Sequence, residues 1–285
     1  MSAEMPPPAG ATRADPARIE PVPGVAKPDP ILIATDLRRA FGGLKAVDVD
    51  RLEVQRGWIT SMIGPNGAGK TTLFNVLTGF DKPQEGHWHL NGGALVGIPS
   101  FRVARRGMVR TFQLTKSLAR LTVVENMLVA AKDQTGEGFF GALLGRWHAT
   151  ERRNEERAMA SLEQFGLAHM ADQYAGSLSG GQRKLLEMAR ALMVEPELVM
   201  LDEPTAGVNP ALTQSLLGHI TGLRDRGMSV VFIEHDMDVV QEISDWVVCL
   251  SQGRIIAEGP PRVVARNPAV IDAYLGTHHG EEPDG

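Results

Sequence analysis

From residue 58 onward the chain alternates short apolar runs with amphipathic segments. Apolar runs of about five residues are typical of strands that are buried on both faces, whereas apolar residues at the helical period are typical of helices that cover such strands. This alternation predicts an α/β protein with a parallel core sheet. The predicted strands are 58–63, 198–201 and 229–233, and the predicted helices are 70–77 and 182–193.

Other parts of the chain follow different patterns. Alternating segments over 31–54 predict antiparallel strands, and the sequence between 113 and 177 predicts a helical region. Residues 1–30 are rich in proline and alanine and hold few core-forming side chains, so we expect them to be disordered. We expect 277–285 to be a flexible tail. The sequence assigns no role to the N-terminal extension or to the insertion at 133–150.

Composition narrows the class of protein. The chain has 285 residues, 43% of them hydrophobic, with a formal net charge of −5, so it can bury a large core and shows no basic surface for nucleic acid. Its one cysteine, Cys249, lies in an apolar run and predicts a buried structural thiol. No apolar run is long enough to span a bilayer. Glu4 and the prolines at 6–8 stand where a signal peptide would need an apolar core, so we expect another subunit to provide any membrane attachment.

The stretch 64–71 reads GPNGAGKT and fits the P-loop pattern, between a predicted strand and a predicted helix. Its glycines allow the backbone N–H groups to curl round a phosphate, and the helix that follows presents its positive dipole end. The lysine adds a positive charge for the β- and γ-phosphates, and the first threonine offers a hydroxyl to Mg²⁺. The alternative is a glycine-rich turn without a ligand. The residues expected at the nucleotide are Gly64, Pro65, Asn66, Gly67, Ala68, Gly69, Lys70, Thr71 and Thr72.

A pair of carboxylates follows the apolar run 198–201. In parallel sheets, ligands bind outside the carboxyl ends of the strands, which is where this run places its acids. We expect Asp202 to hold Mg²⁺ and Glu203 to act as general base or to orient the attacking water. The alternative for Glu203 is a surface carboxylate that caps the turn at Pro204.

His235 occupies the corresponding place after the run 229–233. An imidazole there can bond a phosphate oxygen and also orient a neighbouring carboxylate, so we interpret His235 as a sensor of the γ-phosphate. A lone histidine is more often structural. The other motifs and the flanking Glu234 and Asp236 favour the functional interpretation.

The stretch 178–182 reads LSGGQ and precedes a strong helical pattern. It predicts a second helix N-terminus with exposed N–H groups, in a chain that has one complete P-loop. We therefore expect Ser179, Gly180, Gly181 and Gln182 to contact the ATP of a partner subunit. The alternative is a helix capped by serine after a flexible turn.

Together these motifs resemble the ATP-binding subunits of ABC transporters over about 31–276. The resemblance implies a P-loop NTPase core with a mixed and parallel sheet, an N-terminal antiparallel β subdomain and a helical subdomain at about 113–180. It implies that Phe41 stacks on adenine, that Val47 packs beside the nucleoside, and that Gln113 reaches Mg²⁺ and the attacking water. Asn209 departs from the aspartate that many relatives carry in the D-loop, so its effect stays open.

Longer matches, among them FGGLKAV, RTFQLTKSLARLTVVENMLVAA and NPAVIDAYLG, resemble the ATP-binding components of branched-chain amino acid importers. That resemblance implies ATP hydrolysis with Mg²⁺, a second ATP-binding subunit in a homodimer or heterodimer, transmembrane permease subunits and an extracytoplasmic solute-binding protein. It places the chain peripherally at the cytoplasmic face of the membrane. Related urea or amide importers and some lipid exporters use similar subunits. A soluble ABC ATPase without a permease is a further alternative, although the chain has neither the second cassette nor the long coiled coil that such proteins usually carry.

Overall fold

A computed structural model describes residues 14–111, 118–131 and 147–275. The chain divides into two units, which are described separately below. Unit 1 takes the described residues of 1–109, 197–204 and 220–285, and unit 2 those of 110–196 and 205–219. The helical subdomain was expected at about 113–180, and unit 2 covers that range, continues to Pro196 and takes in 205–219.

The central sheet has six strands in the order β10-β9-β3-β8-β7-β6. Strand β3 pairs in parallel with both β8 and β9, and β7 pairs in parallel with β8. All five residues of β3 and of β8 are buried, as the continuous apolar runs predict. The expected α/β class with a mixed sheet is confirmed. The strands are β3 (Ile59–Ile63), β6 (Met108–Arg110), β7 (Leu198–Asp202), β8 (Ser229–Ile233), β9 (Trp246–Ser251) and β10 (Arg254–Gly259).

A second sheet holds four antiparallel strands in the order β2-β1-β4-β5. Its first hairpin closes at the pair Phe41 and Leu44, so Gly42 and Gly43 form the turn. Gly42 has a φ of 58°, a conformation that a glycine adopts at little cost. The strands are β1 (Pro30–Phe41), β2 (Leu44–Gln55), β4 (Glu85–Leu90) and β5 (Gly93–Ala94).

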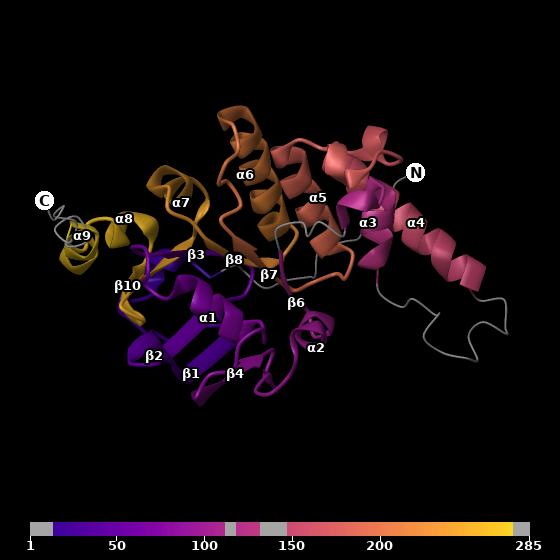
Figure 1. Cartoon of the computed structure of the whole chain (residues 1–285). Helices are drawn as coiled ribbons and strands as arrows, with labels where there is room; N and C mark the ends of the chain where they lie inside the picture. Colours follow the sequence, from indigo (N-terminus) through magenta and orange to yellow (C-terminus); the bar gives the residue numbers. More distant parts are fainter. Residues whose placement is uncertain (1–13, 112–117, 132–146, 276–285) are drawn as a thin grey trace, which may run out of the picture. The chain divides into compact units, whose positions relative to one another are not determined.

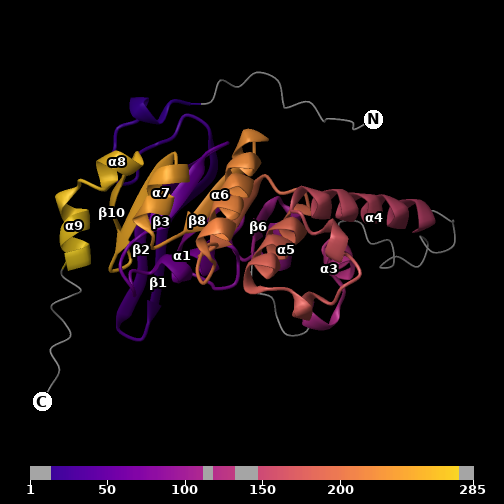
Figure 2. The ribbon, with the colours of Figure 1, turned by 90° about the horizontal axis from the view of Figure 1, so that it is seen from above.

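Helix α1 (Lys70–Leu77) follows β3 and lies between the two sheets of unit 1 (Figure 1). Its buried residues, which include Leu73 and Phe74, belong to one hydrophobic cluster with residues of both sheets. Helix α7 (Met237–Ile243) lies on the other side of the six-stranded sheet, and α8 (Pro261–Val264) and α9 (Pro268–Leu275) lie beside β10 (Figure 2). Unit 1 also holds α2 (Ser100–Arg105).

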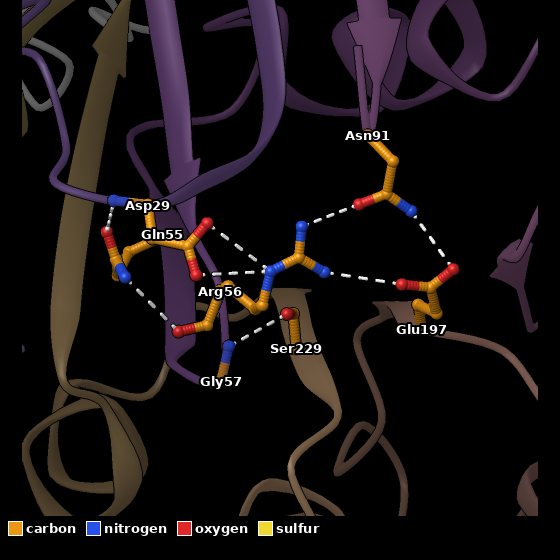
Figure 3. Close-up of polar contacts among 7 residues, drawn as sticks. All are labelled: Asp29, Gln55, Arg56, Gly57, Asn91, Glu197 and Ser229. Carbon is orange, nitrogen blue, oxygen red and sulfur yellow. Dashed lines mark hydrogen bonds and ion pairs between the residues drawn. The ribbon is translucent and has the colours of Figure 1, made fainter. Parts of the chain in front are cut away.

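A polar network ties the start of β3 to both sheets (Figure 3). The Arg56 guanidinium contacts Asp29 at 3.2 Å, Asn91 at 2.7 Å and Glu197 at 3.3 Å, and Asn91 also donates to Glu197. The Gly57 N–H donates to the Ser229 hydroxyl at 2.9 Å, which joins the start of β3 to β8. These contacts lie at the amino end of β3, away from the P-loop at its other end.

Unit 2 is helical. It contains α3 (Val123–Val129), α4 (Trp147–Gln164), α5 (Gly180–Leu192) and the first part of α6 (Pro210–Asp225). Thr122 and Glu125 form a capping box at the start of α3, which satisfies two backbone N–H groups. Single turns of 3₁₀ helix connect these helices at Leu118–Arg120, Ala168–Met170 and Ala175–Ser177, whereas that at Pro16–Arg18 belongs to unit 1. Among the described residues, no helix combines the length and the apolar content that crossing a bilayer requires.

The expectation that residues 1–30 are disordered is not met over 14–29, which we call the N-terminal strap. The strap runs along unit 1 (Figure 2), and its Ile19 and Val25 pack against the core. The Lys27 ammonium lies 3.3 Å from the Glu258 carboxylate, with side-chain exposures of 1% and 0%, and 4.1 Å from the centre of the Trp246 ring. Lys27 N–H donates to Glu53 at 2.6 Å. Composition did not predict this order, because two isolated apolar side chains, a buried ion pair and backbone bonds to buried carboxylates hold the segment, and none of them forms a run in the sequence.

Burial lowers the pKa of Lys27 and raises the pKa of Glu258, while their mutual attraction opposes both shifts. Removing one partner of such a pair leaves an uncompensated buried charge. We expect Lys27→Met to lower the free energy of unfolding by about 3–5 kcal/mol, measured by urea denaturation. The double variant Lys27→Met with Glu258→Gln removes both charges and should regain a large part of that loss. A single variant as stable as the parent would contradict the assignment.

Candidate functional site

The P-loop leaves β3 at Gly64 and enters α1 at Lys70. Gly64, Gly67 and Gly69 have φ values of 143°, 76° and 98°, in the region that glycine favours. A Cβ atom on Gly64 would lie 2.1 Å from the Leu250 carbonyl oxygen, and one on Gly69 would lie 2.0 Å from that of Ala46. Backbone conformation and close approach therefore both require glycine at these two positions, as the motif predicts.

Hydrogen bonds hold the loop from two sides. The Gly253 N–H, in the turn between β9 and β10, donates to the Ala68 carbonyl at 2.9 Å. The Lys70 ammonium donates to the carbonyls of Gly64 at 2.7 Å and Pro65 at 3.0 Å. Burial lowers the pKa of Lys70, and the carboxylates of Glu203 and Asp202 oppose this shift. Lys70 thus places a positive charge within the loop and near both acids.

The remaining loop residues differ in exposure. Asn66, Gly67 and Thr71 are exposed, so their backbone N–H groups and the Thr71 hydroxyl lie at the surface of the site. Pro65 and Thr72 are half-buried, and Ala68 packs in the core. Because α1 begins at Lys70, its free N–H groups and its positive dipole end belong to the same site. This arrangement suits an anion such as the phosphate chain of a nucleotide.

The two carboxylates lie at the same edge of the sheet. Asp202 is the last residue of β7 and pairs with Ile233 of β8, which in turn pairs with Met62 of β3. These three residues form one row across the sheet, so the segments that follow them leave at one edge. Glu203 has a φ of 47°, uncommon for a residue with a side chain, and its N–H donates to the Ile233 carbonyl at 3.1 Å. Unusual backbone of this kind is frequent at functional sites.

His235 and Glu203 contact each other directly. The His235 Nε2 atom lies 2.6 Å from the Glu203 Oε1 atom, and both side chains are 43% exposed. With Glu203 ionised the carboxylate accepts and Nε2 donates. The segment after β8 is itself held in place, because the His235 N–H donates to buried Glu234 at 3.0 Å and Asp236 caps α7. The imidazole is thus in direct contact with the Glu203 carboxylate, while the roles of both residues toward a nucleotide stay predictions.

The ligand chemistry here suits Mg²⁺ better than a metal held by protein alone. Within 14–111, 118–131 and 147–275 no cluster of three or more His, Cys, Asp or Glu side chains is placed to hold a metal ion. Mg²⁺ typically takes one or two protein oxygen ligands together with substrate phosphates and water. The Thr71 hydroxyl and the Asp202 carboxylate are hard oxygen donors of this type, so the residues present fit the ion.

Three further residues were expected at the nucleotide. Phe41 ends β1 with 49% of its surface exposed, and the Arg39 guanidinium stacks 4.3 Å from its ring centre. Its exposed ring leaves a face for an adenine. Val47 is 1% exposed and packs in the core, so its contact with a nucleoside stays a prediction. Gln113 lies outside the described residues, and its role also stays a prediction.

The LSGGQ stretch begins α5 in unit 2. The Ser179 hydroxyl accepts from the Gln182 N–H at 3.3 Å, and the Gln182 side chain accepts from the Ser179 N–H at 2.9 Å, which forms a capping box. Gly180 is exposed, whereas Gly181 is buried against Leu212 of α6. A Cβ atom on Gly181 would lie 1.6 Å from the Leu212 side chain, so a larger residue there would displace Leu212. The helix is thus capped by Ser179, as the alternative interpretation of this stretch expected. This cap does not prevent a contact with the ATP of a partner. In the same unit, the Asn209 side chain accepts from the Leu212 N–H at 3.0 Å.

Two further residues lie next to the loop, and the sequence analysis assigned a role to only one of them, Cys249. Cys249 is buried, and burial raises its pKa to about 12, which agrees with an unreactive structural thiol. The Gly64 N–H donates to the Tyr274 hydroxyl of α9 at 2.9 Å. These residues are 210 positions apart, so no local spacing could have paired them. The closing NPAVIDAYLG stretch was the only signal, and it marked similarity to a subgroup, not a contact.

A P-loop at the carboxyl edge of a mixed sheet, with an acid pair and a histidine at the same edge, defines a P-loop nucleotide-binding protein. Residues 47–206, more than half of the chain, match the family model for ABC transporter, and residues 254–280 match that for branched-chain amino acid ATP-binding cassette transporter. The chain belongs to the ABC transporter ATP-binding family. The resemblance read from the motifs is confirmed at this level.

Individual relatives and solved structures of the same family are similar to this chain. The chain is 44% identical to the high-affinity branched-chain amino acid transport ATP-binding protein BraF of Pseudomonas aeruginosa, over 87% of this chain and 98% of that protein. It is 41% identical to a probable branched-chain amino acid transport ATP-binding protein of Archaeoglobus fulgidus, over 88% and 97%. A crystal structure of an ATP-binding cassette of an ABC transporter in its ADP conformation is similar, with a TM-score of 0.77, 36% identity, and coverage of 87% of this chain and 99% of that chain.

Proposed function

We propose that this chain is the ATP-hydrolysing subunit that powers an importer of branched-chain amino acids. The contact between Glu203 and His235, at the sheet edge that also carries the P-loop, is the observation that favours hydrolysis over binding alone. The names of the relatives and the match at 254–280 support the cargo. Family membership supports ATP as the nucleotide.

The P-loop accounts for binding of the nucleotide phosphates. The backbone N–H groups of 67–71 and the start of α1 attract the phosphates, and Lys70 turns its ammonium from the loop carbonyls to the β- and γ-phosphate oxygens. Thr71 and Asp202 would hold the magnesium ion. When bound, Mg²⁺ neutralises the charge that develops on the phosphates. Phe41 offers its exposed ring to the adenine.

Hydrolysis requires a water in line with the γ-phosphate. Glu203 accepts a proton from that water or orients it, and His235 holds the carboxylate in one position through its 2.6 Å contact. His235 also carries a second hydrogen-bonding nitrogen, which suits a sensor of the γ-phosphate. Gln113 adds a contact to the magnesium ion and the water, as the family resemblance implies.

The signature stretch belongs to a different unit from the P-loop. We propose that Ser179, Gly180, Gly181 and Gln182 contact the ATP bound to a second ATP-binding subunit, so that each ATP lies between two chains. The γ-phosphate then stabilises the closed dimer more than the open one, and hydrolysis removes this difference. Permease subunits receive the resulting motion at the cytoplasmic face of the membrane, and a solute-binding protein delivers the cargo outside.

Glu203→Gln tests the catalytic step. Because the amide cannot accept the proton, we expect ATP turnover to fall by roughly 10²- to 10⁴-fold while ATP binding persists and ATP-bound dimers accumulate. Steady-state phosphate release measures turnover, and light scattering follows dimers. Glu85→Gln, an exposed acid on β4, is the matched control and should keep normal turnover. Unchanged turnover in the Glu203 variant would remove Glu203 from this role.

Mixing two inactive variants tests the shared site. A chain with Lys70→Ala retains its signature stretch, and a chain with Ser179→Arg retains its P-loop. A mixed dimer has one site with both defects and one site with neither. We therefore expect mixtures to recover ATPase activity, up to one competent site per mixed dimer. If mixed dimers form but show no activity, the ATP is not shared between chains.

Uptake assays test the cargo. The complex is purified with its membrane subunits and reconstituted into vesicles with ATP at the side of this chain. We expect ATP-dependent accumulation of leucine, isoleucine and valine, and none with Glu203→Gln. Transport of urea or amides alone, export of lipid, or recovery of the chain without any polytopic subunit would each contradict the proposed function.

A further inference from the structure

The first residue of the P-loop is bonded on both sides of its backbone. The Gly64 N–H donates to the Tyr274 hydroxyl at 2.9 Å, and the Gly64 carbonyl accepts from the Lys70 ammonium at 2.7 Å. Leu250 restricts Gly64 further, because its carbonyl oxygen leaves no room for a side chain. The loop therefore leaves β3 in one fixed direction, and Tyr274 is the part of this arrangement that comes from the C-terminal helix.

Helix α9 buries few apolar side chains. Val270 and Tyr274 lie one turn apart on one face of the helix, and Val270 is the one residue of α9 that is fully buried. Ile271 and Leu275 are 44% and 59% exposed. Ala273 and the Tyr274 ring are half-buried, so the contact that Tyr274 makes with Gly64 adds to a small buried surface that keeps the helix docked.

The role of Lys70 gives this contact a consequence for the nucleotide. When the Lys70 ammonium moves to a phosphate, Gly64 loses the bond to its carbonyl, and the Tyr274 hydroxyl still holds its N–H. Burial raises the pKa of Tyr274, so the hydroxyl stays neutral at physiological pH and remains able to accept this bond. A docked α9 thus favours the loop conformation in which the phosphate site is formed.

We propose that Tyr274 is a positioning residue that couples the docking of helix α9 to nucleotide binding at the P-loop, an inference that rests on the proposed ATP site. Coupling of this kind is reciprocal. If a docked helix strengthens nucleotide binding, a bound nucleotide must strengthen docking of the helix by the same factor. The C-terminal helix then reports the state of the nucleotide site to whatever contacts its exposed face.

The variant Tyr274→Phe removes the hydroxyl and keeps the ring. We expect its affinity for MgADP, measured by calorimetry on the full chain, to fall by about 2- to 10-fold, as the loss of one hydrogen bond implies. The KM for ATP should rise by a similar factor while kcat stays within about twofold, because no group that contacts the reacting atoms has changed. Ile271→Ala, on the exposed face of the same helix, is the matched control and should keep the parent affinity.

Hydrogen exchange measures the reverse direction. We expect MgADP to slow exchange of the α9 amide protons in the parent chain and in Ile271→Ala, but not in Tyr274→Phe. A purely structural role for Tyr274 would lower the thermal midpoint and leave this nucleotide-dependent protection intact. Parent affinity in Tyr274→Phe, or protection of α9 that persists in it, would overturn the coupling alone. A parent chain that fails to bind MgADP would overturn the proposed function and the coupling with it.

Discussion

Parallel pairing of β3 with β8 on one side and β9 on the other is the constraint on which the site depends. Parallel strands end at the same edge, so the segments after β3, β7 and β8 must emerge together there. One turn then supplies the P-loop, the next supplies Asp202 and Glu203, and the third supplies His235. In this way the proposed phosphate cradle, the acid pair and the histidine come from three separate segments that meet at one edge of the sheet. Three short apolar runs form the strands that these segments follow.

The same sheet explains why remote segments matter to the loop. Because β9 is the direct neighbour of β3, the end of β9 and the turn after it lie close to the P-loop. Leu250 limits the residue that can begin the loop, Gly253 bonds its middle, and Tyr274 bonds its first N–H. On β10, Glu258 holds the N-terminal strap through Lys27. The N-terminal strap is thus attached to β10, and helix α9 is attached to the first residue of the P-loop.

How far the sequence predicts this structure depends on the range of each contact. The P-loop, the acid pair and the signature stretch are contiguous, and their conformation follows from glycine, strand and helix preferences within about ten residues. Lys27 and Tyr274 escaped detection for the opposite reason. Lys27 stands in a segment whose composition suggests disorder, and its partner Glu258 is 231 positions away. Tyr274 lies near the end of a short helix, and the sequence of this helix has no clear hydrophobic period. The sequence predicted a helical region at about 113–180, whereas the return of the chain to unit 2 at Thr205 depends on its path after Glu203, which no local pattern encodes.

In the proposed function Glu203 acts on the attacking water and His235 holds Glu203, and this arrangement affects when hydrolysis can occur. A carboxylate 43% exposed to solvent would sample several rotamers if nothing held it, and each wrong rotamer would place the base away from the attacking water. The bond to His235 selects one of them. His235 follows β8 and the phosphate cradle follows β3, so loss of the His235 contact would impair the proposed base and leave the cradle in place. Binding and hydrolysis are therefore separable within one site. Such separation is what a transport ATPase requires, because ATP must remain bound until the machinery that it drives is in place.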